Sequence, residues 1–348
     1  MKKFGLKRLT SYSLFLPILC LLLVLILNLV QTPSFFKITI QNGVLYGFII
    51  DILNRSSGLI LMAVGMTLVV ASSGGTDISV GAVSALGGAV CVVVLGTGDA
   101  YQLPYILSLL LPLLVGLLCG AFNGFLVSYM KVQPMVATLI LFTAGRGIAQ
   151  LVTGSFILYV KPKEFQYLGS FLPGIPIPTP FFVAAFVIIA TWLILRYTSI
   201  GMYIESVGIN RKASRLIGLN SRLIMLYTYI FCGACAAAAG LISVSRTASI
   251  DANNVGLNME LDAILAVAIG GNNLGGGKFS LIGSVIGAVT IQALTTTLYA
   301  MHVSADQLPL YKAIVVIIIV ALQSPVIRKW YHSVKSRLTL GRTVKEAN

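Results

Sequence analysis

Charged residues are scarce in this chain of 348 residues: 10% are Asp, Glu, Lys or Arg, whereas 57% are hydrophobic. An ordinary soluble domain carries about 25% charged residues, so the composition excludes that class. The chain also lacks a polar stretch long enough to form a second, soluble domain. We therefore expect an all-α fold, a polytopic membrane helix bundle that makes up a single transmembrane domain over residues 1–348.

Residues that bind metals or carry redox chemistry are also few. His302 and His332 are the two histidines, and the sequence shows neither a His/Glu cluster nor a nucleophile beside a base, so it gives no support for an enzyme, a metal site or a cofactor. The five cysteines all lie in apolar runs, which argues against a disulfide framework. Cys232 and Cys235 form C-x-x-C among small residues, where we expect packing, with a metal or redox site as the alternative.

The hydrophobic residues are grouped in runs that suit membrane helices. A bilayer core needs about 20 mostly apolar residues per helix. We predict about ten spans, at 12–30, 56–72, 79–96, 104–129, 133–153, 179–197, 222–245, 261–271, 280–299 and 308–324. The eighth and ninth are short or interrupted by glycine, which predicts broken or tilted helices, and Leu45–Asn54 is apolar enough to lie in the interface or to extend the second span.

The net charge of +14 lies mainly at the ends of the spans, where basic residues set orientation, and it does not suggest nucleic-acid binding. An even number of spans places both basic termini on one side, which the positive-inside rule makes the cytoplasm. The predicted organisation is a membrane bundle over 12–324, a cytoplasmic loop at 205–222 and a basic cytoplasmic tail at 325–348.

The loop at 205–222 is a basic segment between long apolar runs. It carries Arg211, Lys212, Arg215 and Arg222 against one acid, Glu205. Its composition is compatible with helix. The segment marks the cytoplasmic side, and it also suits a soluble partner that docks there.

Glycines recur at four-residue spacing in two of the predicted spans. Gly116, Gly120 and Gly124 lie in the fourth, and Gly283 and Gly287 lie in the ninth. This spacing gives a helix a flat face on which another backbone can approach closely. Packing inside the bundle is the expected role, and a dimer face is the alternative.

Several polar residues lie within or between the spans. Arg146 is costly at membrane depth, so it faces protein or water, either along a solute path or as a structural pair with a carbonyl or carboxylate. Asp77 follows Gly74 and Gly75 at a break, where it either caps the next helix or contacts solute. The candidate pathway residues are Asp77, Asn123, Thr138, Arg146, Gln150, Asn272 and Asn273.

The segment GGNNLGGGK at 270–278 is not a phosphate-binding loop. The motif G-x-x-x-x-G-K-[ST] requires glycine where Asn272 stands, and Phe279 follows Lys278 in place of serine or threonine. The chain has no nucleotide-binding domain, so any use of ATP requires another subunit.

Three segments together are similar to motifs of the ribose-type sugar ABC transporter permeases, a family that includes branched-chain amino acid permeases. They are SSGGTDISVGA (72–82), GINRKASRLIGL (208–219) and LNMELDAILAVAIGGNNLGGGKFSLIGSVIGA (257–288). The resemblance covers nearly the entire chain. Within the family, the segments at 51–58, 136–151 and 203–210 most resemble permeases of galactofuranose importers.

The resemblance implies an ABC importer permease fold of about ten helices in a bacterial inner or plasma membrane. The implied partners are a second permease subunit, identical or paralogous, an extracytoplasmic sugar-binding protein and an ABC ATP-binding subunit that binds the ATP. The loop between spans six and seven, here 205–222, would form the coupling helices that dock on the ATPase. The coupling positions carried over are Gly208, Asn210, Ala213, Arg215 and Gly218.

These expectations make the chain a permease that translocates a monosaccharide such as galactofuranose or ribose by alternating access. An ABC permease for nucleosides or branched-chain amino acids is one alternative. An ion-driven secondary transporter is another alternative. Such proteins often carry buried acids along the path, whereas the acids of this chain other than Asp77 fall near the ends of the predicted spans, which argues against this class. The sequence departs from the family pattern at Thr76, where isoleucine is usual, and at Ile78, where leucine is common.

Overall fold

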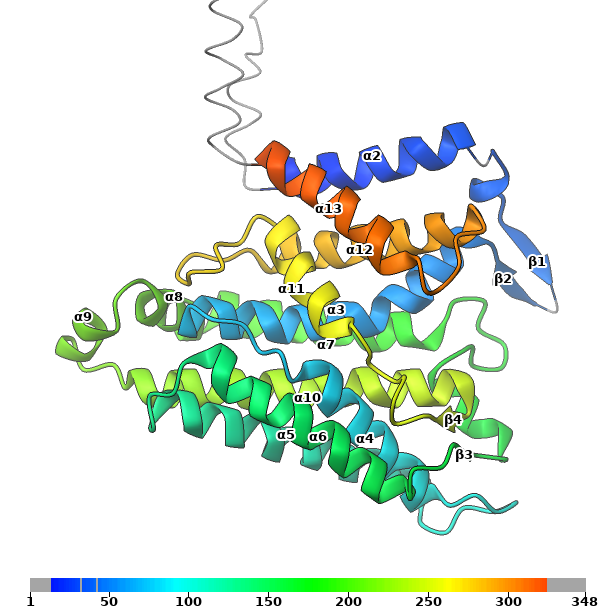
Figure 1. Ribbon diagram of the computed structural model, residues 1–348, viewed down its shortest axis with the longest axis horizontal. Coiled ribbons are helices and arrows are strands. Elements are labelled where there is room, and N and C mark those ends of the chain that lie inside the picture. The colour runs from blue at the N-terminus through cyan, green and yellow to red at the C-terminus, as the bar shows by residue number, and fades with distance from the viewer. Residues whose placement is uncertain (1–13, 32, 42, 324–348) are drawn as a thin grey trace, which may run out of the picture. The chain divides into compact units, whose positions relative to one another are not determined.

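The computed structural model describes residues 14–31, 33–41 and 43–323, and the regular structure in this part of the chain is mainly helical (Figure 1). Two short antiparallel pairs are the exceptions: β1 (Thr39–Gln41) with β2 (Val44–Tyr46), and β3 (Leu158–Tyr159) with β4 (Ser249–Ile250). The chain divides into two compact units after Thr296. The predicted basic tail at 325–348 lies outside the described residues.

Each predicted span coincides with a helix. They are α2 (Phe15–Gln31), α3 (Phe48–Ser73), α4 (Val80–Leu95), α5 (Tyr105–Ser128), α6 (Pro134–Thr153), α7 (Thr179–Tyr197), α10 (Ser221–Thr247), α11 (Met259–Ile269), α12 (Leu281–Ala300) and α13 (Leu308–Gln323). Two further helices, α8 (Ile200–Ile209) and α9 (Arg211–Leu216), lie in the segment that connects α7 to α10. Two short 3₁₀ helices, η1 (Pro33–Phe36) and η2 (Lys163–Leu168), lie in loops.

The helices differ in whether they can cross a bilayer alone. Among the described residues, six are long and apolar enough to do so: α3, α5, α6, α7, α10 and α12. By contrast α11 has 11 residues, which is about 16 Å of helix and about half of a bilayer core. The eighth predicted span is therefore a short helix, whereas the ninth, α12, is an unbroken helix of 20 residues, so the prediction of a break is wrong for the ninth. The apolar 45–54 segment extends α3, which begins at Phe48.

The first compact unit is built around α10, which packs against α3, α4 and α5 (Figure 1). The glycine face of α5 makes this contact: a Cβ on Gly116 would lie 2.5 Å from the Gly233 carbonyl oxygen of α10, and one on Gly120 would lie 2.8 Å from the Ile230 Cα. The expected packing role is confirmed. The alternative dimer face is wrong, because α10 of the same chain already covers it.

Cys232 also serves packing, because a Cβ on Gly65 of α3 would lie 2.8 Å from its Cα atom. Within the described part of the chain, His, Cys, Asp and Glu do not gather into a group that could hold a metal ion.

The two ends of the first unit differ in charge. One end holds α8, α9 and the loop after α11, and the other holds β3 and β4 (Figure 1). The basic segment at 205–222 is at the first end, whereas Asp99 in the loop after α4 and Glu164 in η2 are at the second, together with Lys161 and Lys163. This distribution is the one that the charge pattern predicts.

Candidate translocation and coupling sites

The break between α3 and α4 is closed by the carboxylate of Asp77. Gly74 ends α3 in the left-handed conformation with φ 64°. One carboxylate oxygen of Asp77 accepts hydrogen bonds from the Ser79 amide at 2.9 Å and the Ser79 hydroxyl at 2.6 Å. The Asn123 side chain donates to the same oxygen at 3.4 Å and to the Ser79 hydroxyl at 2.8 Å. Asp77 therefore holds the turn just before α4, but the N-cap residue of that helix is Ser79, so the prediction that Asp77 itself caps α4 is wrong.

The same break is tied to α6. The Ile78 amide donates to the Thr138 hydroxyl at 3.1 Å, and a Cβ on Gly75 would lie 2.5 Å from Pro134. Asp77, Asn123 and Thr138 thus come together from three elements, and each is at most 1% exposed. Three of the predicted pathway residues form one closed polar cluster in this conformation.

Arg146 and Gln150 lie in a second place, toward the end of α6 that faces the α10–α11 connection. The Arg146 guanidinium donates to the carbonyls of Ala252, Asn253 and Val255 at 3.2, 2.8 and 3.3 Å. Gln150 donates to the Asn253 side chain. These contacts are the backbone pairing that the structural interpretation of Arg146 expects, and contact with solute stays a prediction.

Glu260 is a buried acid that composition alone does not single out. It lies in the first turn of α11, is 3% exposed and sits directly against Gly81 of α4. Gly81 leaves room for this side chain on α4, but the sequence does not show that α4 and α11 meet there.

Asn272 and Asn273 occupy a third place, in the glycine-rich loop after α11. Asn272 donates to the Val267 carbonyl at 3.0 Å and to the Ser284 hydroxyl at 2.8 Å, and Thr67 of α3 donates to that hydroxyl at 2.6 Å. The exposed Asn273 accepts from the Gly275 amide at 3.0 Å. Asn272 therefore ties α11 and α12 to α3, and neither asparagine joins the Asp77 cluster.

The predicted coupling segment folds into α8 and α9. The Asn210 side chain caps α9 by accepting from the Lys212 and Ala213 amides at 3.0 Å each. Arg215 donates to the Ser221 hydroxyl at 2.8 Å. Ala213, Arg215 and Gly218 are exposed, and Gly218 has a φ of 86° that suits the turn after the helix. Four of the five predicted coupling positions therefore either stabilise this segment or lie on its solvent-exposed surface. They are Asn210, Ala213, Arg215 and Gly218.

Gly208 has a different position. A Cβ there would overlap the Ala71 carbonyl oxygen and lie 2.6 Å from the Gly277 amide nitrogen. The Gly277 amide in turn donates to the Ala71 carbonyl at 2.9 Å, and a Cβ on Gly74 would lie 2.8 Å from the Gly275 carbonyl. Three backbone segments, from α3, α8 and the loop after α11, therefore meet without side chains between them.

Arg211 adds a side-chain link to the same junction by donating to the Ser73 carbonyl at the end of α3. Partial burial lowers the pKa of its guanidinium from the usual value. Ser73 lies four residues before Asp77, so the coupling segment is connected to the closed break through one short stretch of backbone.

Three apolar side chains in the coupling segment are exposed. Leu216 is 90% exposed, Ile217 is 74% exposed and Ile209 is 66% exposed. The sequence analysis missed them, although a leucine and an isoleucine beside basic residues in a polar loop were a visible signal. An exposed apolar group with a polar rim is typical of a protein interaction site.

Comparisons with known proteins agree with these features. Residues 48–322 match the family described as "Branched-chain amino acid transport system / permease component". The chain is 43% identical over 324 residues to the galactofuranose transporter permease protein YtfT of Escherichia coli K12, covering 92% of each chain. It is 37% identical to the fructose import permease protein FruF of Bifidobacterium longum, over 97% of this chain and 95% of the relative.

The ribose import permease protein RbsC of Escherichia coli K12 is 34% identical over 88% of this chain and 92% of its own length. No solved structure matches. These relatives are named as permeases, which agrees with the apolar helices described above. The chain therefore belongs to the family of branched-chain amino acid transport system permease components, as a multi-pass membrane transport subunit and not an enzyme.

Proposed function

We propose that this protein is the permease subunit of an ATP-binding-cassette importer for a monosaccharide, with galactofuranose or a related furanose as the expected substrate. The observation that carries the proposal is the 43% identity over 92% of the chain to a galactofuranose transporter permease, supported by relatives named for fructose and ribose import. Residues predicted for the pathway supply amide, hydroxyl and guanidinium groups, which suit the hydroxyls of a sugar.

The proposed mechanism is alternating access driven from the coupling segment. A separate ATP-binding subunit docks on α9 and its exposed apolar group, Leu216 and Ile217. When that subunit closes on ATP, it moves α8, and α8 moves the end of α3 through the contact between Gly208 and Ala71. Because backbone contacts backbone at this point, with no side chain between them, side-chain rotation cannot absorb the movement of α8 before it reaches α3. The Asp77 cluster then opens toward the cytosol.

The remaining partners and the orientation belong to the same proposal. The basic end of the bundle faces the cytoplasm, with both termini there, and the end that holds β3 and β4 faces outward. An extracytoplasmic sugar-binding protein delivers the substrate to the outer end. A second permease subunit, identical or paralogous, completes the pathway.

Uptake by the reconstituted importer tests the substrate. The permease, its ATP-binding subunit and the cognate binding protein are placed in proteoliposomes, and ATP-dependent uptake is measured for galactofuranose, ribose, fructose, a nucleoside and leucine. We expect accumulation of a furanose and no accumulation of leucine. Accumulation of leucine or the nucleoside alone would overturn the choice of substrate.

A second measurement separates the class of transporter. The permease is reconstituted without its ATP-binding subunit, and proton or sodium gradients are imposed across the membrane. We expect no uphill movement of sugar. Uphill uptake under an ion gradient would show that the chain is a secondary transporter and not the permease of an ATP-driven importer.

A further inference from the structure

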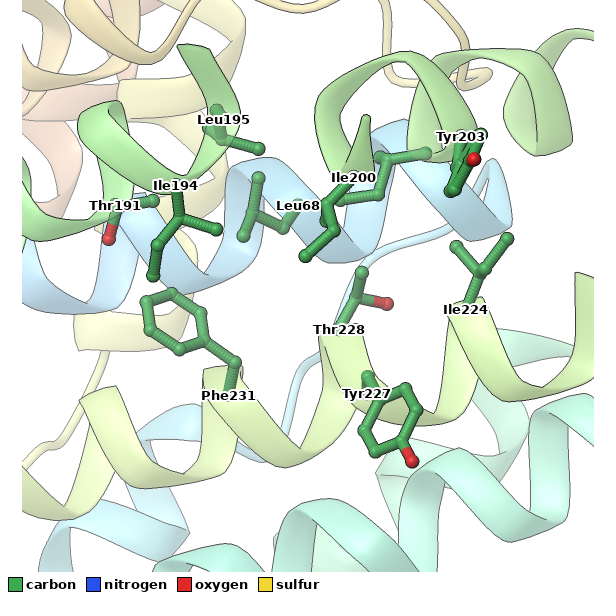
Figure 2. A pocket seen from close by; sticks show the side chains of 11 residues that line it. Leu68, Thr191, Ile194, Leu195, Ile200, Tyr203, Ile224, Tyr227, Thr228 and Phe231 are labelled. Carbon is green, nitrogen blue, oxygen red and sulfur yellow. The ribbon is translucent and has the colours of Figure 1, made fainter. Parts of the chain in front are cut away.

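An apolar groove lies where α7, α8 and α10 meet over α3, away from the polar clusters described above (Figure 2). Its volume is about 230 Å³. Leu68 of α3 forms the floor, Ile194 and Leu195 of α7 form one wall, and Phe231 of α10 forms the other. Ile200, the first residue of α8, also lines it and lies beside Leu68 (Figure 2).

The residues that line this groove are not suited to binding a sugar. Its surface is almost entirely hydrocarbon, and the Thr228 hydroxyl is already engaged with the Met225 carbonyl at 2.7 Å and the Ser72 hydroxyl at 2.8 Å. In Figure 2 the hydroxyls of Thr191 and Tyr227 point away from the space between the side chains. Sugar hydroxyls placed here would lose their hydrogen bonds with water and gain none.

The groove is also not a sealed packing defect. Ile194 is 48% exposed and Tyr227 is 63% exposed, so the space communicates with the surroundings of the bundle. It is larger than the roughly 150 Å³ apolar cavity that binds benzene in an engineered protein. An empty space of this size forfeits the dispersion contacts of every group that lines it, which favours occupation by hydrocarbon.

The depth of the groove identifies the hydrocarbon. Along α10 its lining runs from Ile224 to Phe231, which is about 5 to 15 Å from the start of the helix at 1.5 Å per residue. One leaflet of a bilayer core is about 15 Å deep, half of the full 30 Å. The groove therefore runs through one leaflet, at the end of the bundle that holds α8 and α9. At the same end Arg196 is exposed directly after Leu195, where it suits a lipid phosphate.

We propose that this groove is a binding site for one acyl chain of a bilayer phospholipid, held between α10 on one side and α7 and α8 on the other. The site is distinct from the solute pathway and does not depend on which solute is carried. Because α8 forms part of the lining, the bound chain also supports the helix that leads into the coupling segment.

Photolabelling in a bilayer tests the site. The full-length permease is reconstituted in nanodiscs of phosphatidylethanolamine and phosphatidylglycerol that contain a phospholipid with a diazirine in one acyl chain. After irradiation, labelled peptides are quantified by mass spectrometry. We expect labelling of 191–204 and 224–231 to exceed that of lipid-exposed α5, at 106–118, by about fivefold, the ratio that a difference near 1 kcal/mol produces.

Substitutions that fill the groove provide the discriminating comparison. Ile194→Trp places an indole in the space from α7, and Ile200→Trp does so from α8. We expect either change to reduce the excess labelling of the groove peptides to the level of α5, which serves as the internal standard. The matched control Ile189→Trp, on a 56% exposed position of α7 outside the groove, leaves the excess intact.

Two results would overturn the proposal. One is equal labelling of the groove and α5 in the unchanged protein. The other is excess labelling that persists in both Ile194→Trp and Ile200→Trp, provided that each variant unfolds thermally within the range of the control. The first result would mean that the groove does not retain a chain, and the second that the label attaches outside it.

Discussion

At the scale of single residues, Asp77 and Arg146 are both held by polar partners, which include the neighbouring Ser79 for Asp77 but lie far away in sequence for Arg146. Asp77 caps a turn with Ser79 and Asn123, and Arg146 donates to three carbonyls of the α10–α11 connection. A structural role for Asp77 could be predicted from the sequence, because it follows Gly74 and Gly75 and precedes an apolar run, but its exact place in the turn before the N-cap residue Ser79 could not. The partner of Arg146 could not, because it is 106 or more residues away in the chain.

Replacing Asp77 distinguishes its structural role from solute contact. Asp77→Ala leaves the buried Ser79 amide without an acceptor, a loss of about 1–2 kcal/mol, so we expect a lower unfolding temperature in detergent. Asp77→Asn keeps an acceptor oxygen and should retain most of the stability and of the ATP-dependent uptake. If Asp77→Asn instead abolished uptake while the unfolding temperature stayed unchanged, the carboxylate would contact solute.

Gly208 is the residue on which the proposed coupling depends most. In Gly208→Ala the new methyl group overlaps the Ala71 carbonyl oxygen, so α8 must move away from α3. We expect ATP-dependent sugar uptake to fall by about tenfold, a barrier change near 1.4 kcal/mol, with normal amounts of protein in the membrane. Gly98→Ala is the matched control, since its nearest neighbour would be the Ala100 carbonyl at 3.7 Å. Equal uptake in the two variants would contradict the coupling route.

At the scale of elements, hydropathy predicted where the helices lie but not how they serve the sites. The ten predicted ranges each hold a helix because apolar runs of this length must satisfy their backbone internally in lipid. The 3₁₀ helix η2 could not be recognised from composition, because it lies in the loop between α6 and α7, which carries Pro162, Pro173, Pro176 and Pro178. The junction of α3, α8 and the 275–277 loop was also hidden, because glycine spacing alone does not say which backbone approaches.

The exposed Leu216 and Ile217 side chains should contribute to the free energy of binding of the ATP-binding subunit. Burying a leucine side chain contributes about 1.5–3 kcal/mol, so Leu216→Ser should weaken binding of the ATP-binding subunit by about 10–100-fold. Co-purification of the two subunits at increasing dilution measures this. Leu151→Ser is the control. Leu151 is 81% exposed and lies near the C-terminal end of α6, at the end of the bundle opposite α9, so this change should not affect assembly. Weakened assembly in the Leu151→Ser variant alone would place the docking surface at the wrong end.

At the scale of the whole chain, the proposed function requires that the two ends of the bundle differ. The basic coupling segment and its apolar group lie at one end, and the loop with Asp99 lies at the other. Charge distribution alone predicted this polarity. What charge could not predict is that the coupling segment reaches the Asp77 break through two short contacts, Gly208 with Ala71 and Arg211 with Ser73.

The most direct test is photo-crosslinking in cells that express the complete importer. A photoreactive amino acid is placed at exposed Ala213 of α9, and the matched control carries it at Asp99, whose side chain is 90% exposed. We expect an adduct with the ATP-binding subunit from position 213 and none from position 99. An adduct of position 213 with the extracytoplasmic binding protein, or of position 99 with the ATP-binding subunit, would contradict this expectation.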